Sequence, residues 1–233
     1  MADTTLLELP LIAASQAQKH VTHNEALLRL DALVALSVID RDLAAPPVSP
    51  ADGERYLVAA GASGDWVDQD DRIAVFQAGA WIFLVPREGW TAWIEDEGRH
   101  IAYHAGGWMA GIAASQSGAT IALEILEEEV TTSASASLDT TIEIPDRAIV
   151  FAVSTRTTEA VSGAASYDCG IAGEPGKFGA TLGVAAGSAN SGVIGPAPFY
   201  AAAPVRLTAN GGDFSGGKIR VAIQFMRCAA PAA

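Results

Sequence analysis

The chain has 233 residues, of which 50% are hydrophobic and 18% charged, and its 27 acidic side chains against 14 basic ones give a net charge of −13. This composition suits one or two globular domains, and its charge repels phosphate backbones, so we expect no nucleic-acid binding. No apolar run reaches the ~18 residues of a membrane-spanning helix, and the N-terminus lacks the pattern of a signal peptide, so we expect no membrane insertion.

The first region, residues 1–50, is predicted to be a helical, anchoring segment. An extended stretch over residues 6–12 precedes a helix within residues 17–43, where Thr22 and Glu25 have the spacing of a capping box. The leucines and valines of this helix cover more than one stripe without a heptad, which indicates burial against its own domain or against copies of the chain. Three prolines at positions 46, 47 and 50 are expected to end the helix.

The second region, residues 51–112, contains a repeated phrase. Residues 76–83 read FQAGAWIF and residues 103–110 read YHAGGWMA. An Ala-Gly turn between strand-like runs predicts a β-hairpin in each case, with Trp66 in a third, looser copy. Tryptophans in this region could stack on sugar rings. A small meander, however, needs large side chains to build its core, so a structural role is favoured for Trp81 and Trp108.

The third region, residues 120–233, is predicted to be a β-sandwich of jelly-roll type, which makes the whole chain mainly β. Strand-like runs occupy residues 122–132, 141–144, 148–158, 167–172, 200–209 and 218–227. Residues 173–199, rich in Gly, Ser, Ala and Asn, are expected to form a long loop, and loops of this length are commonly functional.

This third region also holds the candidate ligand-binding residues. Polar and aromatic side chains at loops and strand ends suit sugar hydroxyls, with amides and carboxylates as hydrogen-bond partners and rings as stacking floors. An ordinary role in turns is the alternative for each of them. The predicted carbohydrate-binding set is Tyr167, Asp168, Lys177, Phe178, Asn190, Tyr200, Asn210 and Asp213.

Signals for catalysis or for metal and cofactor binding are weak. The histidine pairs 20/23 and 100/104 lack a third ligand, and the G-x-x-x-x-G-K match at residues 212–218 runs into a strand, so no metal and no cofactor are expected. Acidic clusters at residues 65–71 and 95–97 leave a polysaccharide-cleaving carboxylate pair open as an alternative. Free, buried thiols are favoured for Cys169 and Cys228, although the sequence does not decide whether they pair.

Several of these segments resemble a known family. Residues 9–27 (LPLIAASQAQKHVTHNEAL) are similar to the opening signature of an uncharacterised-domain family of alphaproteobacterial phages and gene transfer agents, and the Trp-bearing hairpins continue the likeness. Residues 144–150 (IPDRAIV), 167–173 (YDCGIAG) and 207–212 (LTANGG) resemble the companion domain of such proteins. The resemblance implies a virion-associated fibre or head spike that attaches to host capsular polysaccharide, and it offers no catalytic residues.

Taken together, these observations favour a non-enzymatic spike on the surface of a particle assembled in the bacterial cytoplasm. Its expected partners are capsular polysaccharide, other virion proteins bound through the N-terminal region, and copies of itself, with a trimer favoured. The alternatives are a polysaccharide-degrading spike enzyme and a structural adaptor between the particle and a separate fibre.

Overall fold

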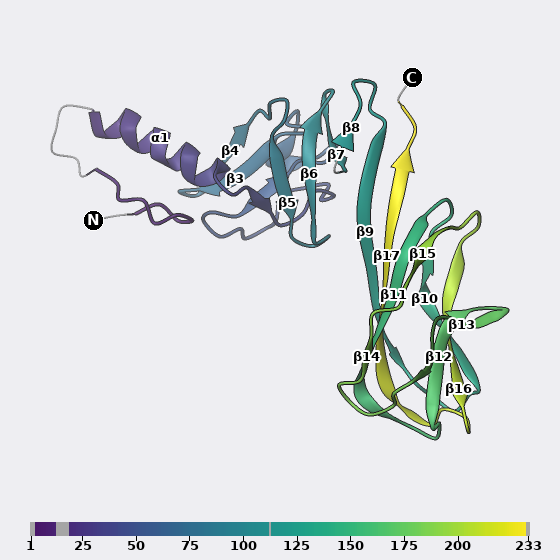
Figure 1. The fold of residues 1–233 in the computed structure, drawn as a ribbon. Helices are drawn as coiled ribbons and strands as arrows, with labels where there is room; N and C mark the ends of the chain where they lie inside the picture. The colour runs from purple at the N-terminus through teal and green to yellow at the C-terminus, as the bar shows by residue number, and fades with distance from the viewer. Residues whose placement is uncertain (1–2, 13–18, 112, 232–233) are drawn as a thin grey trace. The chain divides into compact units, whose positions relative to one another are not determined.

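The computed structural model describes residues 3–12, 19–111 and 113–231, and the chain divides into two compact units, residues 1–118 and 119–233 (Figure 1). The prediction of a mainly β chain with an N-terminal helix is confirmed. The expected division at residue 50 falls inside the first unit, because Ala32 and Val38 share one core with Ile73 and Ile101 of the hairpins. No helix in the described part is long and apolar enough to cross a membrane.

Helix α1, Lys19–Leu33, lies within the predicted range of residues 17–43, but its two ends do not have the signals that the sequence predicts. The capping box is wrong, because Thr22 and Glu25 lie inside the helix. The helix ends well before the three prolines, and Ala35 then adopts a left-handed backbone, with φ of 50°, as residues just after helix C-termini often do. Residues 17 and 18 of the predicted range lie outside the described residues.

A buried carboxylate attaches the N-terminal segment to this helix. Asp31 is almost fully buried and accepts hydrogen bonds from Thr4 Oγ1 at 2.6 Å and from the backbone N–H groups of Leu6 and Leu7. These contacts fold residues 5–7 into a turn, so the stretch predicted as extended is partly a turn. A buried charge is tolerated here because three donors replace the water that it loses.

The first unit contains two small sheets, with strand orders β1-β5-β6-β7 and β2-β3-β4. The strands of these sheets are β1 Ser37–Val38, β2 Arg55–Leu57, β3 Ile73–Gln77, β4 Ala80–Leu84, β5 Thr91–Ile94, β6 Arg99–His104 and β7 Gly107–Ala110, and the short β8 Ala113–Ala114 belongs to neither of them.

The repeated phrase forms two hairpins, as predicted. Ala78-Gly79 joins β3 to β4 and Ala105-Gly106 joins β6 to β7, with φ of 49° and 80° in the first turn and 51° and 86° in the second. Two successive positive φ values are typical of a type I′ turn, whose twist matches that of the strands. Each phrase also places an aromatic pair directly across the hairpin, with ring centroids 5.0 Å apart for Phe76 and Trp81.

Trp66 is not a third copy of this hairpin. It lies on a short 3-10 helix, η1 Gly64–Trp66, and is fully buried. Its ring contacts those of Tyr56 and Trp81, with centroids 5.5 and 5.2 Å away. Trp81 therefore belongs to an aromatic core, which agrees with the structural role favoured from the sequence.

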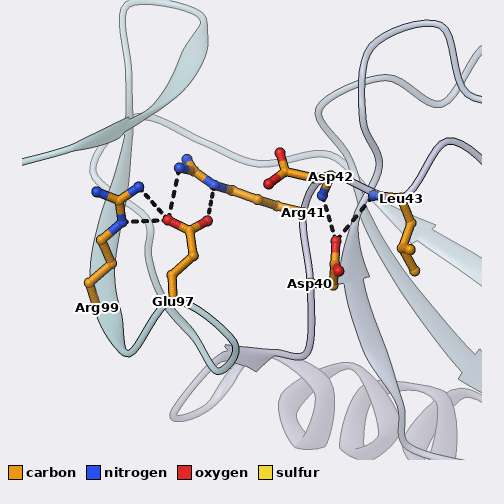
Figure 2. A network of polar contacts seen from close by, with 6 residues as sticks. All are labelled: Asp40, Arg41, Asp42, Leu43, Glu97 and Arg99. Atoms are coloured by element: carbon orange, nitrogen blue, oxygen red, sulfur yellow. Dashed lines mark hydrogen bonds and ion pairs between the residues drawn. The ribbon is translucent and has the colours of Figure 1, made fainter. Parts of the chain in front are cut away.

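An ionic clamp also holds the first unit together (Figure 2). The Glu97 carboxylate lies between the guanidinium groups of Arg41 and Arg99, and Arg41 Nη2 donates to Glu97 Oε2 at 3.1 Å. Burial raises the pKa of Glu97, but the hydrogen bonds and charges of the two arginines outweigh it and leave the pKa below its ordinary value. Beside this clamp, Asp40 Oδ1 accepts from the backbone N–H groups of Asp42 and Leu43.

The second unit is a sandwich of two antiparallel sheets, with strand orders β10-β16-β12-β13 and β14-β11-β17-β9, and with β15 also pairing with β11. Aliphatic and aromatic side chains from the inner faces, such as Val153, Leu207 and Ile223, fill its core. This arrangement is the jelly-roll-like sandwich predicted from the sequence. Its strands are β9 Thr120–Thr131, β10 Ser137–Ile144, β11 Ile149–Ser162, β12 Ser166–Ile171, β13 Glu174–Leu182, β14 Ala189–Asn190, β15 Val193–Pro198, β16 Ala203–Asn210 and β17 Gly216–Ala229.

The long loop predicted over residues 173–199 is wrong, because β13, β14 and β15 all lie within it. Small residues and three prolines hide the alternation that marks a strand, yet the backbone here still pairs with β11 and β12. Strand β15 contains Pro196 and Pro198, which cannot donate to a sheet ladder and are compatible with a strand at the margin of the sheet. The segment is therefore built into the sandwich.

Candidate functional site

Two of the eight predicted carbohydrate-binding residues lie in the core of the second unit. Tyr167 is 1% exposed and Phe178 is 3% exposed, and the Tyr167 hydroxyl donates to Thr155 Oγ1 at 3.2 Å. Both side chains point inward from their strands, where sequence alternation places them between the two sheets. A sugar on the surface cannot stack on rings in this position, so neither residue enters the candidate site.

Asp168 and Asn210 lie together on the outer face of the sheet β10-β16-β12-β13. Asn210 Nδ2 donates to Asp168 Oδ1 at 2.7 Å, and the backbone N–H of Thr181 donates to the same oxygen at 2.7 Å. Because β12 pairs with β16, neighbouring outward-facing positions bring these two side chains together. Asp168 Oδ1 is thus already occupied by donors from the chain itself, and this surface is an internally bonded polar face.

Three more predicted residues are dispersed. Lys177 forms an ion pair with Glu174 at 3.0 Å and lies 6.0 Å from the centre of the Phe199 ring. Tyr200 is 83% exposed in the turn between β15 and β16, and Asp213 is exposed in the turn before β17. None of these three residues lines the hollow that contains Asn190.

Asn190 is different, because it lines a polar hollow on the outer face of the sheet that contains β14, β11, β17 and β9. The hollow has a volume of about 450 Å³. Residues of β9, β11, β14 and β17 and the residue after β14 surround it. The lining residues are Glu127, Ser154, Thr155, Arg156, Ala189, Asn190, Ser191, Arg220 and Ala222.

One wall of the hollow is a segment held against β11 by backbone contacts. Thr157 N donates to Ser188 O at 2.9 Å, and Val153 N donates to Gly192 O at 3.1 Å, so residues 188–192 are fixed at both ends. Gly192 has φ of 56°, and a Cβ at this position would lie 1.8 Å from Val153 O, so only glycine permits this close approach. Asn190 Nδ2 donates to Phe178 O at 2.9 Å, which fixes the side-chain amide.

The floor of the hollow comes from strand alternation. Val153 and Thr155 face the core, so Ser154 and Arg156 lie on the opposite face of β11, and Ala222 and Arg220 lie beside them on β17. Arg156 and Arg220 occupy directly opposite positions in the antiparallel register. Two guanidinium groups therefore lie at one end of the hollow.

The two arginines differ in the number of carboxylates beside them. Arg220 Nη2 donates to Glu129 Oε2 at 3.1 Å, and Arg220 Nε lies 3.7 Å from Glu127 Oε1. The hydrogen bond that Thr158 donates to Glu129, together with nearby Lys218 and Arg220, lowers the pKa of Glu129, so this carboxylate stays ionised at neutral pH. The Arg156 side chain has no hydrogen-bond or ion-pair partner among the described residues.

Sequence reasoning identified one member of the hollow and missed its other polar members. Asn190 belongs to the predicted set as a polar residue in an expected loop. Arg156 and Arg220 carried a weaker signal, since the alternation in residues 148–158 and 218–227 predicts that they face outward. Nothing in the sequence indicates that the two strands pair with Arg156 opposite Arg220, or that residues 188–192 cover them.

The other candidates for chemistry have ordinary partners. Within residues 3–12, 19–111 and 113–231, no group of three or more His, Cys, Asp or Glu side chains is arranged to hold a metal ion. In the acidic clusters, Asp70 accepts from Gly61 N, and Glu95 accepts from Ser37 Oγ. Both cysteines are free, and Cys169 is buried as expected, with a pKa that burial raises to about 12. Cys228, in contrast, is exposed.

Comparisons with known proteins give a family match within the first unit. A solved chain described as the cyanophage Pam1 capsid asymmetric unit is similar over 54% of this chain and 96% of its own, with 18% identity and a TM-score of 0.34, a likeness too slight to bear on fold or function. No curated protein matches this chain. Residues 23–109, which span most of α1 and the hairpins up to β7, match the model of a family described as a protein of unknown function, DUF2793.

Proposed function

We propose that this chain is a spike or fibre component of a phage-like particle, and that it binds host capsular polysaccharide without altering it chemically. The observation that carries the proposal is the hollow around Asn190. Hydroxyl, carboxylate and guanidinium groups converge there on a rigid sheet, and these groups recognise sugar hydroxyls by hydrogen bonding.

The particle-associated role is supported by the sequence resemblance of residues 9–27 and of the hairpins after them to proteins of phages and gene transfer agents. We assign anchoring to other virion proteins to this N-terminal part, which leaves the second unit to meet the host surface. On this proposal the protein is displayed on the particle after assembly in the bacterial cytoplasm.

A role without catalysis is supported by the lining of the hollow. Glycoside hydrolysis usually needs two carboxyl groups about 5–10 Å apart across the scissile bond. Among the nine lining residues only Glu127 carries a carboxylate, and it lies 3.7 Å from Arg220. A polysaccharide-degrading enzyme is accordingly the less favoured alternative.

We further propose that copies of the chain associate, with a trimer favoured. Support comes from an apolar area on the outer face of the same sheet as the hollow. Leu123, Ile125 and Val193 are 55%, 66% and 74% exposed, and Gln224 and Ala152 connect Ile125 to Val193 across the sheet. An exposed apolar row of this kind is typical of an interaction surface.

The apolar area and the hollow lie far enough apart for one face of the sheet to serve in both self-association and polysaccharide binding. Leu123 and Glu129 are six residues apart on β9, which separates the two ends of this face by about 20 Å. Association through the apolar end would display several hollows side by side, and multivalency strengthens the weak binding of single sugars.

The test uses purified full-length chain and capsular polysaccharide from a candidate host. Wild type should bind the polymer, and Ala222→Tyr, which places a ring in the hollow, should abolish binding. Thr208→Tyr is the matched control, because Thr208 lies on the outer face of the other sheet and should leave binding intact.

Three outcomes would overturn the proposal. Shortened polysaccharide after incubation would favour the enzyme. Firm binding to particles without binding to any polysaccharide would favour the structural adaptor. Equal polysaccharide binding by Ala222→Tyr and wild type would remove the hollow from the proposal.

A further inference from the structure

We propose that the hollow selects acidic sugars, with the carboxylate of a uronic-acid residue bound by the Arg156 guanidinium. This inference rests on the proposed function, and it names the chemical class of the ligand. It is carried by the difference between Arg156 and the other arginines of the second unit.

Four of the five arginines in the second unit have a carboxylate within 4.0 Å. Arg206, on the outer face of the other sheet, is the clearest example, because its Nε and Nη2 donate to the two oxygens of Asp139 at 2.7 Å each. Arg156 is the exception in the described part of this unit. It lines the hollow, and the one carboxylate among the lining residues, that of Glu127, lies beside Arg220 at 3.7 Å.

The neighbouring charge explains why a ligand carboxylate fits this position. Like charges directly opposite each other on adjacent strands destabilise a sheet, and Arg156 lies directly opposite Arg220. Glu129 neutralises Arg220 at 3.1 Å, but no carboxylate of the described chain neutralises Arg156. A bound anion would offset that charge, and a carboxylate matches the two-pronged geometry of a guanidinium.

The rest of the hollow suits a sugar ring attached to that carboxylate. In the wall formed by residues 188–192, Asn190 pairs with the core-facing Thr155 and its amide is turned toward Phe178 O, so Ser154 on the floor of the hollow supplies a hydroxyl for a sugar instead. Ser191 contributes an exposed hydroxyl on the same wall. The chain as a whole carries a charge of −13, so a polyanion needs a local cation of this kind in order to bind, and its binding should weaken as salt screens that contact.

The first experiment compares an acidic polysaccharide containing glucuronic acid with the same polymer after its carboxyl groups are reduced to alcohols. Wild type should bind the acidic polymer, and both Arg156→Gln and carboxyl reduction should weaken binding about tenfold or more, as expected when a charge-assisted hydrogen-bonded pair is lost. Arg147→Gln removes the same charge from an exposed arginine in a turn and should change affinity less than about twofold. Arg156→Lys keeps the charge without the fork and should fall between these results.

The second experiment separates this inference from the proposed function. Titration of full-length protein with methyl glucuronide, methyl glucoside and inorganic sulfate is followed through the side-chain Nε–Hε signal of Arg156 by NMR. The glucuronide should shift that signal, the glucoside should not, and a shift with sulfate alone would show a general anion site and overturn the carboxylate assignment.

The remaining outcomes are distinguishable. If the reduced polymer binds as tightly as the acidic one and Ala222→Tyr abolishes both, polysaccharide binding stands and the acidic preference is wrong. If no polymer binds while the glucuronide still shifts the Arg156 signal, the site stands and the proposed function fails. If neither binds, both proposals fail.

Discussion

The two units differ in the side chains that fill their cores and in the lengths of their strands. The first unit holds all five tryptophans, between residues 66 and 108, and it combines short hairpins with aromatic pairs and an ionic clamp at Glu97. The second unit has no tryptophan, and its long strands pack a core of mostly aliphatic side chains with some tyrosine and phenylalanine. The hairpins of the first unit pair strands that are close in sequence, and β1 with β5 and Arg41 with Glu97 join its more distant segments. The second unit depends mainly on long pairings between distant strands, such as β17 with β9 and with β11.

This difference bears on where a ligand site can be formed. Large aromatic side chains in the first unit contribute to its core, as Trp66 and Trp81 show. In the second unit the backbone registers position the core, so the outward-facing positions of β11 and β17 are available for polar side chains. The candidate site accordingly lies on the long-stranded unit.

The largest effect that tests this comparison is expected from Trp66→Ala. Trp66 is fully buried against Tyr56 and Trp81, and removing a large buried aromatic side chain costs about 3–5 kcal/mol. Urea unfolding followed by the fluorescence of the four remaining tryptophans reports on the first unit alone. Trp93→Ala, at a position 37% exposed, is the control and should cost clearly less, whereas equal costs would contradict an aromatic core centred on Trp66.

In the second unit the corresponding change is to the backbone, at Gly192→Ala. The added Cβ would meet Val153 O at 1.8 Å and the residue would keep a φ of 56°, so we expect a loss of about 2–3 kcal/mol and loss of polysaccharide binding as residues 188–192 leave β11. Gly187→Ala has a similar positive φ, 89°, but open space around its Cβ, and should cost only about 1 kcal/mol. Urea unfolding followed by circular dichroism measures the free energy of unfolding of both variants. Equal losses of stability would show that the close approach of Gly192 to Val153 O is unimportant.

The same contrast explains which parts of the fold could be predicted from the sequence. The hairpins were predictable because each signal lies within eight residues: a strand, an Ala-Gly turn and a returning tryptophan. The strands of the sandwich that alternate clearly, such as residues 218–227, were predictable for the same reason. Strands β13, β14 and β15 were not, because pairing with distant strands, and not their own small residues, keeps them extended.

The candidate site was less predictable than the fold. A polar or aromatic residue type near a loop or strand end predicts surface positions for Tyr167 and Phe178, whose inward direction depends on the strand register. It omitted Arg156 and Arg220, which are 64 positions apart and meet only through the pairing of β11 with β17. A site formed on a sheet by distant strands leaves no local pattern in the sequence. The sequence therefore predicts the class of ligand, but not which residues come together to bind it.

A smaller effect is expected from Glu97→Gln, which removes the charge from the clamp of the first unit. Glu97 is mostly buried between Arg41 and Arg99, so we expect a loss of about 1–2 kcal/mol near neutral pH. Asp146→Asn, at an exposed pair 3.6 Å from Arg147 in the second unit, is the matched control and should have almost no effect.

The pH dependence of this change has a definite sign. The folded-state pKa of Glu97 lies below its unfolded value, so the stabilisation is complete above the unfolded pKa and is lost as pH falls through the lowered, folded value. Wild type and Glu97→Gln should therefore become more alike in stability as the pH enters that acid range. A difference that grew on acidification would contradict the clamp.

The smallest effect, and one of opposite direction, is expected at the turns of the repeated phrase. Ala78 and Ala105 occupy the first central position of their type I′ turns with φ near 50°, a conformation that costs alanine about 1 kcal/mol and that asparagine adopts more readily. Ala78→Asn should thus raise the free energy of unfolding of the first unit by about 0.5 kcal/mol, and adding Ala105→Asn should raise it by a similar amount. Ala80→Asn, one residue into β4, is the control and should give no gain, because asparagine is disfavoured in strands. If the turn variants stabilise the protein no more than this control, the Ala-Gly phrase is not limited by its backbone, and the cross-strand pairs Phe76–Trp81 and Tyr103–Trp108 alone account for its stability.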